Sequence, residues 1–137
     1  MTLRQHRGRR AQARGVSAEA AAVAALQRDG WLVLHQRLRT AAGEVDLLAE
    51  RDGVLAIIEV KARPTLADAA SAVSSRQRAR LLAAADIILA EHPEWGAAGV
   101  RFDVLAVDAA GRVRRIADAF RLGDEAMDAT SPSGRCG

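Results

Sequence analysis

Two carboxylates and one ammonium group, on Asp46, Glu59 and Lys61, have the spacing that a catalytic or metal-binding site requires. Carboxylates opposed on neighbouring strands repel each other, and a divalent cation with oxygen ligands removes that repulsion. Lys61 follows Glu59 by two residues and therefore lies on the same face of a strand. It is the only lysine of the chain, and an ammonium group, unlike guanidinium, has a pKa that its surroundings tune readily. The pattern predicts a cation site with an amine beside it.

A β-hairpin must position these residues. Two runs rich in Val, Leu and Ile, at residues 44–50 and 54–61, flank Asp-Gly at positions 52–53. This dipeptide is typical of a two-residue hairpin turn, which fixes the register of the two strands. The resulting register pairs Glu44 with Lys61, Asp46 with Glu59 and Leu48 with Ile57.

The remaining elements predict an α/β sandwich with a mixed central sheet. Helices are expected from about 17 to 29 and from 71 or 74 to 91, strands at 31–39 and 101–108, and a last strand or short helix at 113–120. Residues 65–72 have no clear period and predict a connection. The hairpin is antiparallel, whereas the long helix crosses over to a parallel strand.

Both predicted helices carry polar side chains on their apolar faces. Glu19 shares a stripe with Val23 and Leu26, where it either complements the helix dipole or reaches the hairpin as a third carboxylate. Gln77 lies inward on the second helix and either bonds a neighbouring strand or lines the site. In the second case the flanking Arg76 and Arg80 would contact phosphates.

Two further polar side chains lie in predicted strands. His35 is expected to be a half-buried or surface residue rather than a metal ligand, and Asp103 to be a structural hydrogen-bond acceptor rather than a site acid.

Length and charge divide the chain into three parts. Its 137 residues predict one domain at 15–122, with a flexible arm at 1–14 and a disordered tail at 123–137. The formal net charge is +3, and the arm is rich in arginine without one acidic residue. Such an arm either contacts a polyanion such as nucleic acid or is simply solvated.

Cysteine use and hydropathy indicate a cytoplasmic protein without a membrane span. The only cysteine, Cys136, allows neither a disulfide framework nor a thiolate metal site. No apolar run approaches the roughly 18 residues that a membrane span requires, and the first residues lack a signal core.

Several motifs in this order resemble a known family over residues 15–120. They are Gly15 with Glu19-Ala20, GEVDLLA, IIEVKAR, Arg76-Gln77 with Arg80-Leu81, RFDV and Asp118-Ala119-Phe120. The set resembles the YraN-like family of uncharacterised bacterial proteins. That family is similar to the PD-(D/E)XK nucleases of the Holliday junction resolvase type. The chain departs from the family in having Arg76 where a lysine is usual, and from the superfamily in having Val45 before Asp46 in place of proline.

The resemblance implies a restriction-endonuclease-like fold and a set of roles. Asp46, Glu59, the Val60 carbonyl and Glu19 would bind Mg²⁺ or Mn²⁺, and Lys61 would orient or help deprotonate the attacking water. Gln77 and Glu44 would be secondary site residues. Residues expected to bind nucleic acid are Arg7, Arg9, Arg10, Arg14, Arg63, Arg76 and Arg80.

Three functions are compatible with these residues. The first is a metal-dependent endonuclease acting on DNA, including branched DNA, and the second is a catalytically silent module that binds nucleic acid. The third is a scaffold for another protein, with the carboxylates serving structure alone. A homodimer, which resolvases of this type form, is left open.

Overall fold

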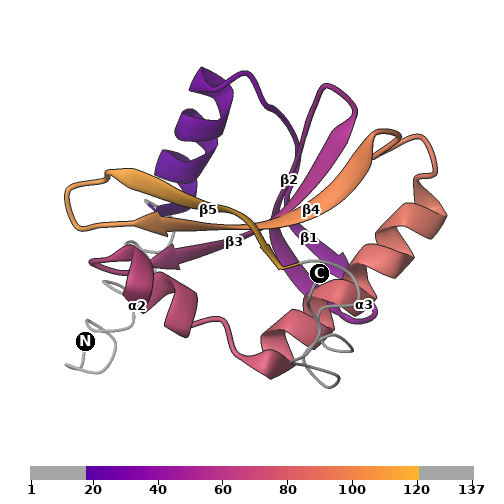
Figure 1. Cartoon of the computed structure of the whole chain (residues 1–137). Helices are drawn as coiled ribbons and strands as arrows, with labels where there is room; N and C mark the ends of the chain where they lie inside the picture. The colour runs from indigo at the N-terminus through magenta and orange to yellow at the C-terminus, as the bar shows by residue number, and fades with distance from the viewer. Residues whose placement is uncertain (1–17, 121–137) are drawn as a thin grey trace, which may run out of the picture.

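The structure of the chain is a computed structural model that describes residues 18–120. The predicted arm at 1–14 and the predicted tail at 123–137 lie outside the described residues. A helix at residues 18–28 comes first, and seven further elements follow it (Figure 1). These are β1 (Leu32–Thr40), β2 (Gly43–Arg51), β3 (Val54–Ala62), α2 (Leu66–Ser71), α3 (Ser75–Glu91), β4 (Gly99–Val107) and β5 (Val113–Phe120).

The five strands form one sheet in the order β1-β2-β3-β4-β5. All neighbouring pairs are antiparallel except β3 and β4, which are parallel because α2 and α3 carry the chain across between them. This is the predicted mixed α/β sandwich, consistent with a restriction-endonuclease-like fold. Residues 102–107 of β4 are all buried, as expected for a strand covered on both faces.

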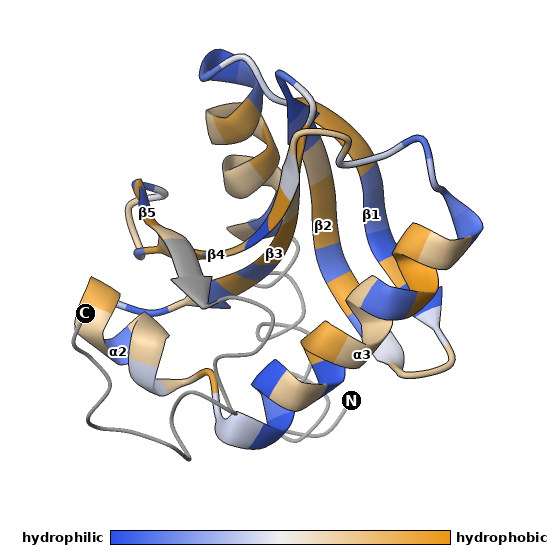
Figure 2. Cartoon of the chain, turned by 45° about the vertical axis from the view of Figure 1, so that its right-hand side comes forward, coloured by the Kyte–Doolittle hydropathy of each residue, from blue (hydrophilic) through white to orange (hydrophobic). Residues whose placement is uncertain are grey.

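The first helix and α3 cover opposite faces of the sheet (Figure 1). On the first helix the buried stripe is Ala18, Ala22 and Leu26, spaced i, i+4 and i+8. The sequence predicts Glu19 and Val23 on this stripe, but Ala18 and Ala22, each one residue earlier, are buried instead. Val23 packs partly against this core, and 18% of the Glu19 side chain is exposed. Figure 2 shows apolar residues, in orange, along the helices and strands, with polar residues, in blue, between them.

α3 begins and ends where the sequence predicts. The Ser74 hydroxyl accepts a hydrogen bond from the Gln77 N–H, and the Gln77 side chain accepts one from the Ser74 N–H, which forms a capping box. The buried face contains Leu81, Ala84, Ala85 and Ile88, and the helix ends before His92. No helix within residues 18–120 is long and apolar enough to cross a membrane.

The short helix α2 was not predicted, because residues 65–72 were interpreted as a connection. Thr65 caps it by accepting a hydrogen bond from the Asp68 N–H. Ala69 is its buried residue and packs with Val104 and Ala106 of β4. Six residues, three of them alanine, give too little periodicity to reveal a helix.

The last element is a strand, and it helps to neutralise Asp103. This carboxylate is fully buried and lies 3.0 Å from Arg101 and 3.5 Å from Arg115 of β5. The guanidinium groups of Arg51, Arg101 and Arg115 lie 5.0, 4.9 and 5.2 Å from the centre of the Trp31 ring. Asp103 is therefore a structural acceptor, as the sequence suggested.

Candidate functional site

The hairpin strands part at Asp46. The predicted register holds over five pairs, from Arg51 opposite Val54 to Leu47 opposite Ile58. The predicted continuation of this ladder to Asp46 opposite Glu59 and Glu44 opposite Lys61 does not form. Instead, the Val60 N–H donates to Asp46 Oδ2 over 2.8 Å. A side-chain acceptor thus replaces a backbone one, and the Asp46 carboxylate lies between the two strands.

Glu59 is a buried carboxylate on the neighbouring strand, β3. Only 5% of the residue is exposed, and its Oε2 lies 3.2 Å from the Lys61 ammonium and 3.5 Å from Nε2 of Gln77, which donates to it. The other oxygen, Oε1, is buried and has no hydrogen-bond partner within residues 18–120. A buried carboxylate oxygen without a donor is costly, so this atom is suited to a further positive group.

The surroundings of Asp46 disfavour its negative charge. Burial, and then the Glu59 carboxylate, raise the pKa of Asp46 to about 6 from its ordinary 3.8. The Val60 N–H and the Lys61 ammonium act in the opposite direction, while Glu19 adds a further rise. The charges of Glu19, Glu59 and Lys61 therefore all act on Asp46, so side chains from the first helix, β2 and β3 lie near one another.

Glu19 is engaged by a residue that the sequence did not reveal. Nε of Arg37 in β1 lies 3.1 Å from each carboxylate oxygen of Glu19. Arg37 has a φ of +55°, a left-handed conformation that is uncommon for arginine. Nothing in the residue type predicts such a conformation, so no sequence signal could have identified Arg37.

The oxygen atoms at this site are suited as ligands of a hard divalent cation. Asp46 and Glu59 supply carboxylate oxygens, and in an extended strand the carbonyl of Val60 lies on the same side as its N–H, which donates to Asp46. The unpartnered Glu59 Oε1 fits such an ion. Within residues 18–120, no three acidic, histidine or cysteine side chains are grouped closely enough to hold a metal by themselves. Glu19 would therefore have to leave Arg37 to become a third carboxylate ligand.

The predicted secondary residues divide into those near the site and those apart from it. Gln77 caps α3 and also donates to Glu59 of β3, so the interpretation that it bonds a neighbouring strand is confirmed, while its role in a site stays a prediction. Glu44 lies instead 3.8 Å from Arg39 of β1, in a half-exposed ion pair. His35 is exposed and lies 5.9 Å from the Trp95 ring.

The predicted phosphate contacts have different settings. Arg76 is exposed on the first turn of α3, while the stem of Arg80 lies so close to Gly43 that a Cβ there would be 2.5 Å from Arg80 Cδ. Arg63 is exposed and donates to the carbonyl of Ala62. The remaining predicted contacts, Arg7, Arg9, Arg10 and Arg14, lie outside the described residues.

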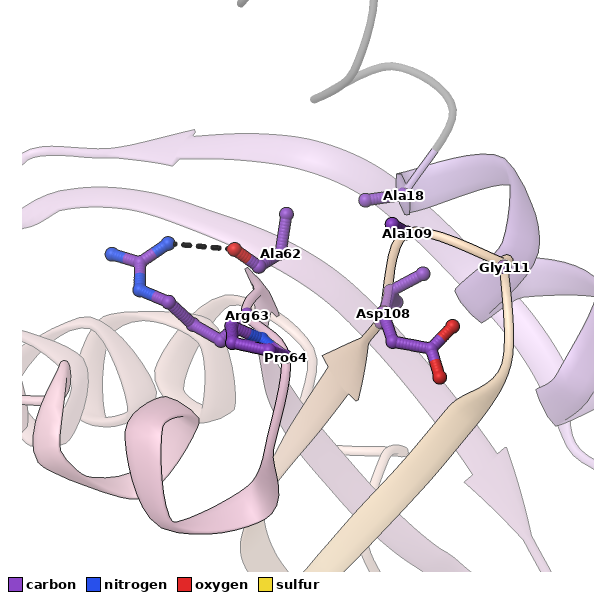
Figure 3. A pocket seen from close by; sticks show the side chains of 8 residues that line it. Ala18, Ala62, Arg63, Pro64, Asp108, Ala109 and Gly111 are labelled. Carbon is purple, nitrogen blue, oxygen red and sulfur yellow. Dashed lines mark hydrogen bonds between the residues drawn. The ribbon is translucent and has the colours of Figure 1, made fainter.

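A pocket of about 290 Å³ lies at the end of β3, where Ala62 and Arg63 follow Lys61 in the sequence (Figure 3). Its lining comes from the start of the first helix, the segment after β3 and the turn after β4. The eight residues are Ala18, Ala62, Arg63, Pro64, Val107, Asp108, Ala109 and Gly111. Asp108 has its oxygens occupied by Ala110 and Arg112, which lowers its pKa. The pocket is thus mostly apolar, and Asp46, Glu59 and Lys61 do not line it.

Comparison with known proteins places the chain among bacterial relatives. A UPF0102 protein of Granulibacter bethesdensis is 61% identical over 87% of this chain and 75% of its own length. UPF0102 proteins of Acidiphilium cryptum and Azorhizobium caulinodans are 48% and 43% identical, over 85% and 88% of this chain and 90% and 92% of theirs. The model of the uncharacterised protein family UPF0102 matches residues 18–107, which include Glu19, Asp46, Glu59 and Lys61. The chain therefore belongs to the UPF0102 family, the YraN-like family that its motifs resemble.

Proposed function

We propose that this protein is a metal-dependent, endonuclease-like hydrolase of phosphodiester bonds, with DNA as its substrate. One observation carries the proposal. The buried Glu59 has one carboxylate oxygen 3.2 Å from the Lys61 ammonium, and the other has no hydrogen-bond donor among residues 18–120. The charge of Glu59 also acts on the Asp46 carboxylate. Structural carboxylates are normally satisfied on both oxygens. This arrangement is instead suited to an ion that completes it.

Each residue has a distinct role in the proposal. Asp46, Glu59 and the Val60 carbonyl hold Mg²⁺ or Mn²⁺, and Glu19 joins them when free. The cation supplies Lewis-acid stabilisation of the charge that develops on a phosphate. Lys61, whose side chain is 15% exposed, presents its ammonium group to the same gap, where it can orient a water molecule and offset negative charge.

Substrate binding would rest on phosphate contacts. Arg76, Arg80 and Arg63 are the described candidates, and Arg7, Arg9, Arg10 and Arg14 are candidates from the sequence. The sequence has no motif that specifies particular bases. Affinity without base contacts depends on phosphates and therefore falls steeply with salt.

The first test is cation binding. Mg²⁺ or Mn²⁺ should raise the melting temperature of the wild type, because a ligand that binds only the folded state stabilises it. Asp46→Asn and Glu59→Gln should lose this rise, whereas Asp86→Asn, an exposed carboxylate on α3, should keep it. The proposal fails if the wild type and Asp46→Asn respond alike.

The second test is cleavage of linear, flapped and four-way DNA with Mg²⁺ or Mn²⁺. Cutting by the wild type but not by Asp46→Asn or Lys61→Met supports a hydrolase. A silent nucleic-acid-binding module is the second candidate, favoured by the Arg37 contact that occupies Glu19. In that case DNA is bound in a salt-dependent manner, and every DNA form stays intact.

A further inference from the structure

Arg37 has a left-handed backbone within β1, directly across from Asp46. Its neighbours Gln36 and Leu38 pair with Leu47 and Val45, so position 37 is the one opposite Asp46. A left-handed residue within a strand costs backbone energy, and proteins concentrate such strain at functional sites. With this backbone conformation the half-exposed Arg37 side chain reaches Glu19.

The ion pair between Arg37 and Glu19 is weak enough for a divalent cation to replace the guanidinium. A single N–H, from Nε, is shared between the two carboxylate oxygens at 3.1 Å each, whereas a tight arginine-carboxylate pair uses two parallel N–H bonds. The Arg37 side chain is 51% exposed, which weakens the attraction further. Glu19 is only 18% exposed and lies close enough to Asp46 for the two carboxylates to repel each other.

We propose that Arg37 is a counter-cation that competes with the divalent metal ion for Glu19. In the metal-free protein Arg37 neutralises this carboxylate and holds it in place. When the ion binds, Glu19 exchanges the guanidinium for the metal, and Arg37 becomes a free cation at the site. Arg37 thus sets the cation affinity of the site as a positioning residue. The inference rests on the proposed metal site at Asp46 and Glu59.

The chain offers a matched pair of variants. Arg37→Asn removes the guanidinium and keeps a residue type that accepts a left-handed backbone. Arg39→Asn removes the same charge two residues away on the same strand. The Arg39 side chain is 89% exposed and lies 3.8 Å from Glu44, so it has no contact with Glu19 to release. A general change in net charge affects both variants, whereas competition for Glu19 affects Arg37→Asn alone.

The experiment is a Mn²⁺ titration of the full chain by calorimetry and thermal shift, which requires no cleavage. Arg37→Asn should bind Mn²⁺ roughly two- to fivefold more tightly than the wild type, the range that loss of a partly exposed ion pair allows. Glu19→Gln should abolish that gain when combined with Arg37→Asn. Arg39→Asn should bind like the wild type.

The outcomes separate the two proposals. Equal Mn²⁺ affinity of Arg37→Asn and the wild type, with binding lost in Asp46→Asn, overturns the competition and leaves the metal site standing. An equal gain in Arg39→Asn, or a gain that survives Glu19→Gln, also overturns it. Absence of Mn²⁺ binding in both the wild type and Arg37→Asn overturns the metal site and the competition together. Binding by Arg37→Asn alone supports competition in its strongest form.

Discussion

At the scale of single residues, the candidate site has three carboxylates, of Glu19, Asp46 and Glu59, and two cationic side chains, of Lys61 and Arg37. Lys61 and Gln77 share one oxygen of Glu59, and Arg37 holds Glu19. Asp46 has one backbone N–H and a raised pKa. Residues at functional sites commonly work against stability in this way. Substitutions at Asp46 and Lys61 measure how much these charges change the free energy of unfolding.

Asp46→Asn should stabilise the metal-free protein at pH 8. Because the pKa of Asp46 is raised to about 6, folding favours the protonated form. This favourable contribution is present below about pH 4 and is lost as the pH rises through 6. A shift of this size is worth about 3 kcal/mol above pH 7.

Urea unfolding between pH 4 and pH 8, in the presence of a chelator, measures the effect. The free energy of unfolding of Asp46→Asn should exceed that of the wild type at pH 8, and the gap should narrow towards pH 4. Asparagine still offers an oxygen to the Val60 N–H, so the gap reports the charge. A gap that is constant with pH would contradict the expectation.

Lys61→Met should destabilise the metal-free protein, by about 3 kcal/mol, because it leaves Glu59 buried without its counter-charge. Methionine retains most of the length of the apolar stem. Saturating Mg²⁺ should recover part of the loss, since the ion replaces the missing positive charge, while DNA cleavage should remain absent. Thermal melts with and without Mg²⁺ measure this, and an equal deficit in both would count against a cation beside Glu59.

At the scale of elements, the hairpin could be predicted because its turn and its apolar runs are local. Asp52-Gly53 fixed the register of five pairs. The separation of the strands at Asp46 could not be predicted, because it depends on a side chain replacing a backbone acceptor. α2 escaped detection because it is short, and the Arg37 irregularity because arginine has no left-handed preference. The converging acids were found because they lie on regular elements.

Gly43 provides a test at the start of β2. Gly43 and Gly99 have nearly equal φ angles, +134° and +138°, but only Gly43 has the Arg80 side chain against it. Replacement of either by alanine should cost about 1 to 3 kcal/mol from backbone strain. The flexible end of Arg80 can move away, so the clash itself should add little to the loss at Gly43.

Displacement of Arg80 should appear in DNA binding. Gly43→Ala should change DNA affinity, whereas Gly99→Ala, with nothing within 4 Å of its new Cβ, should not. Fluorescence anisotropy with labelled DNA, at a temperature where both variants are folded, makes the comparison. Equal DNA affinities of the two variants would exclude a phosphate contact by Arg80.

At the scale of the whole molecule, a formal net charge of +3 and an arginine-rich start predict binding dominated by phosphates. The logarithm of DNA affinity should fall linearly with the logarithm of salt concentration, with a slope of about −0.9 per phosphate contact. Removal of residues 1–14 should make that slope shallower. An unchanged slope would place the phosphate contacts elsewhere, among Arg63, Arg76 and Arg80.

The two layers around the sheet carry separate optical reporters. The chain has two tryptophans and no tyrosine, and Trp31 belongs to the core beneath the first helix while Trp95 packs against the core beneath α3. Trp95 also stacks on His92, with ring centres 3.9 Å apart. The emission of Trp31→Phe and Trp95→Phe therefore follows one layer at a time. Superimposable denaturation curves from the two would mean that the first helix, the sheet and α3 melt as a single cooperative unit.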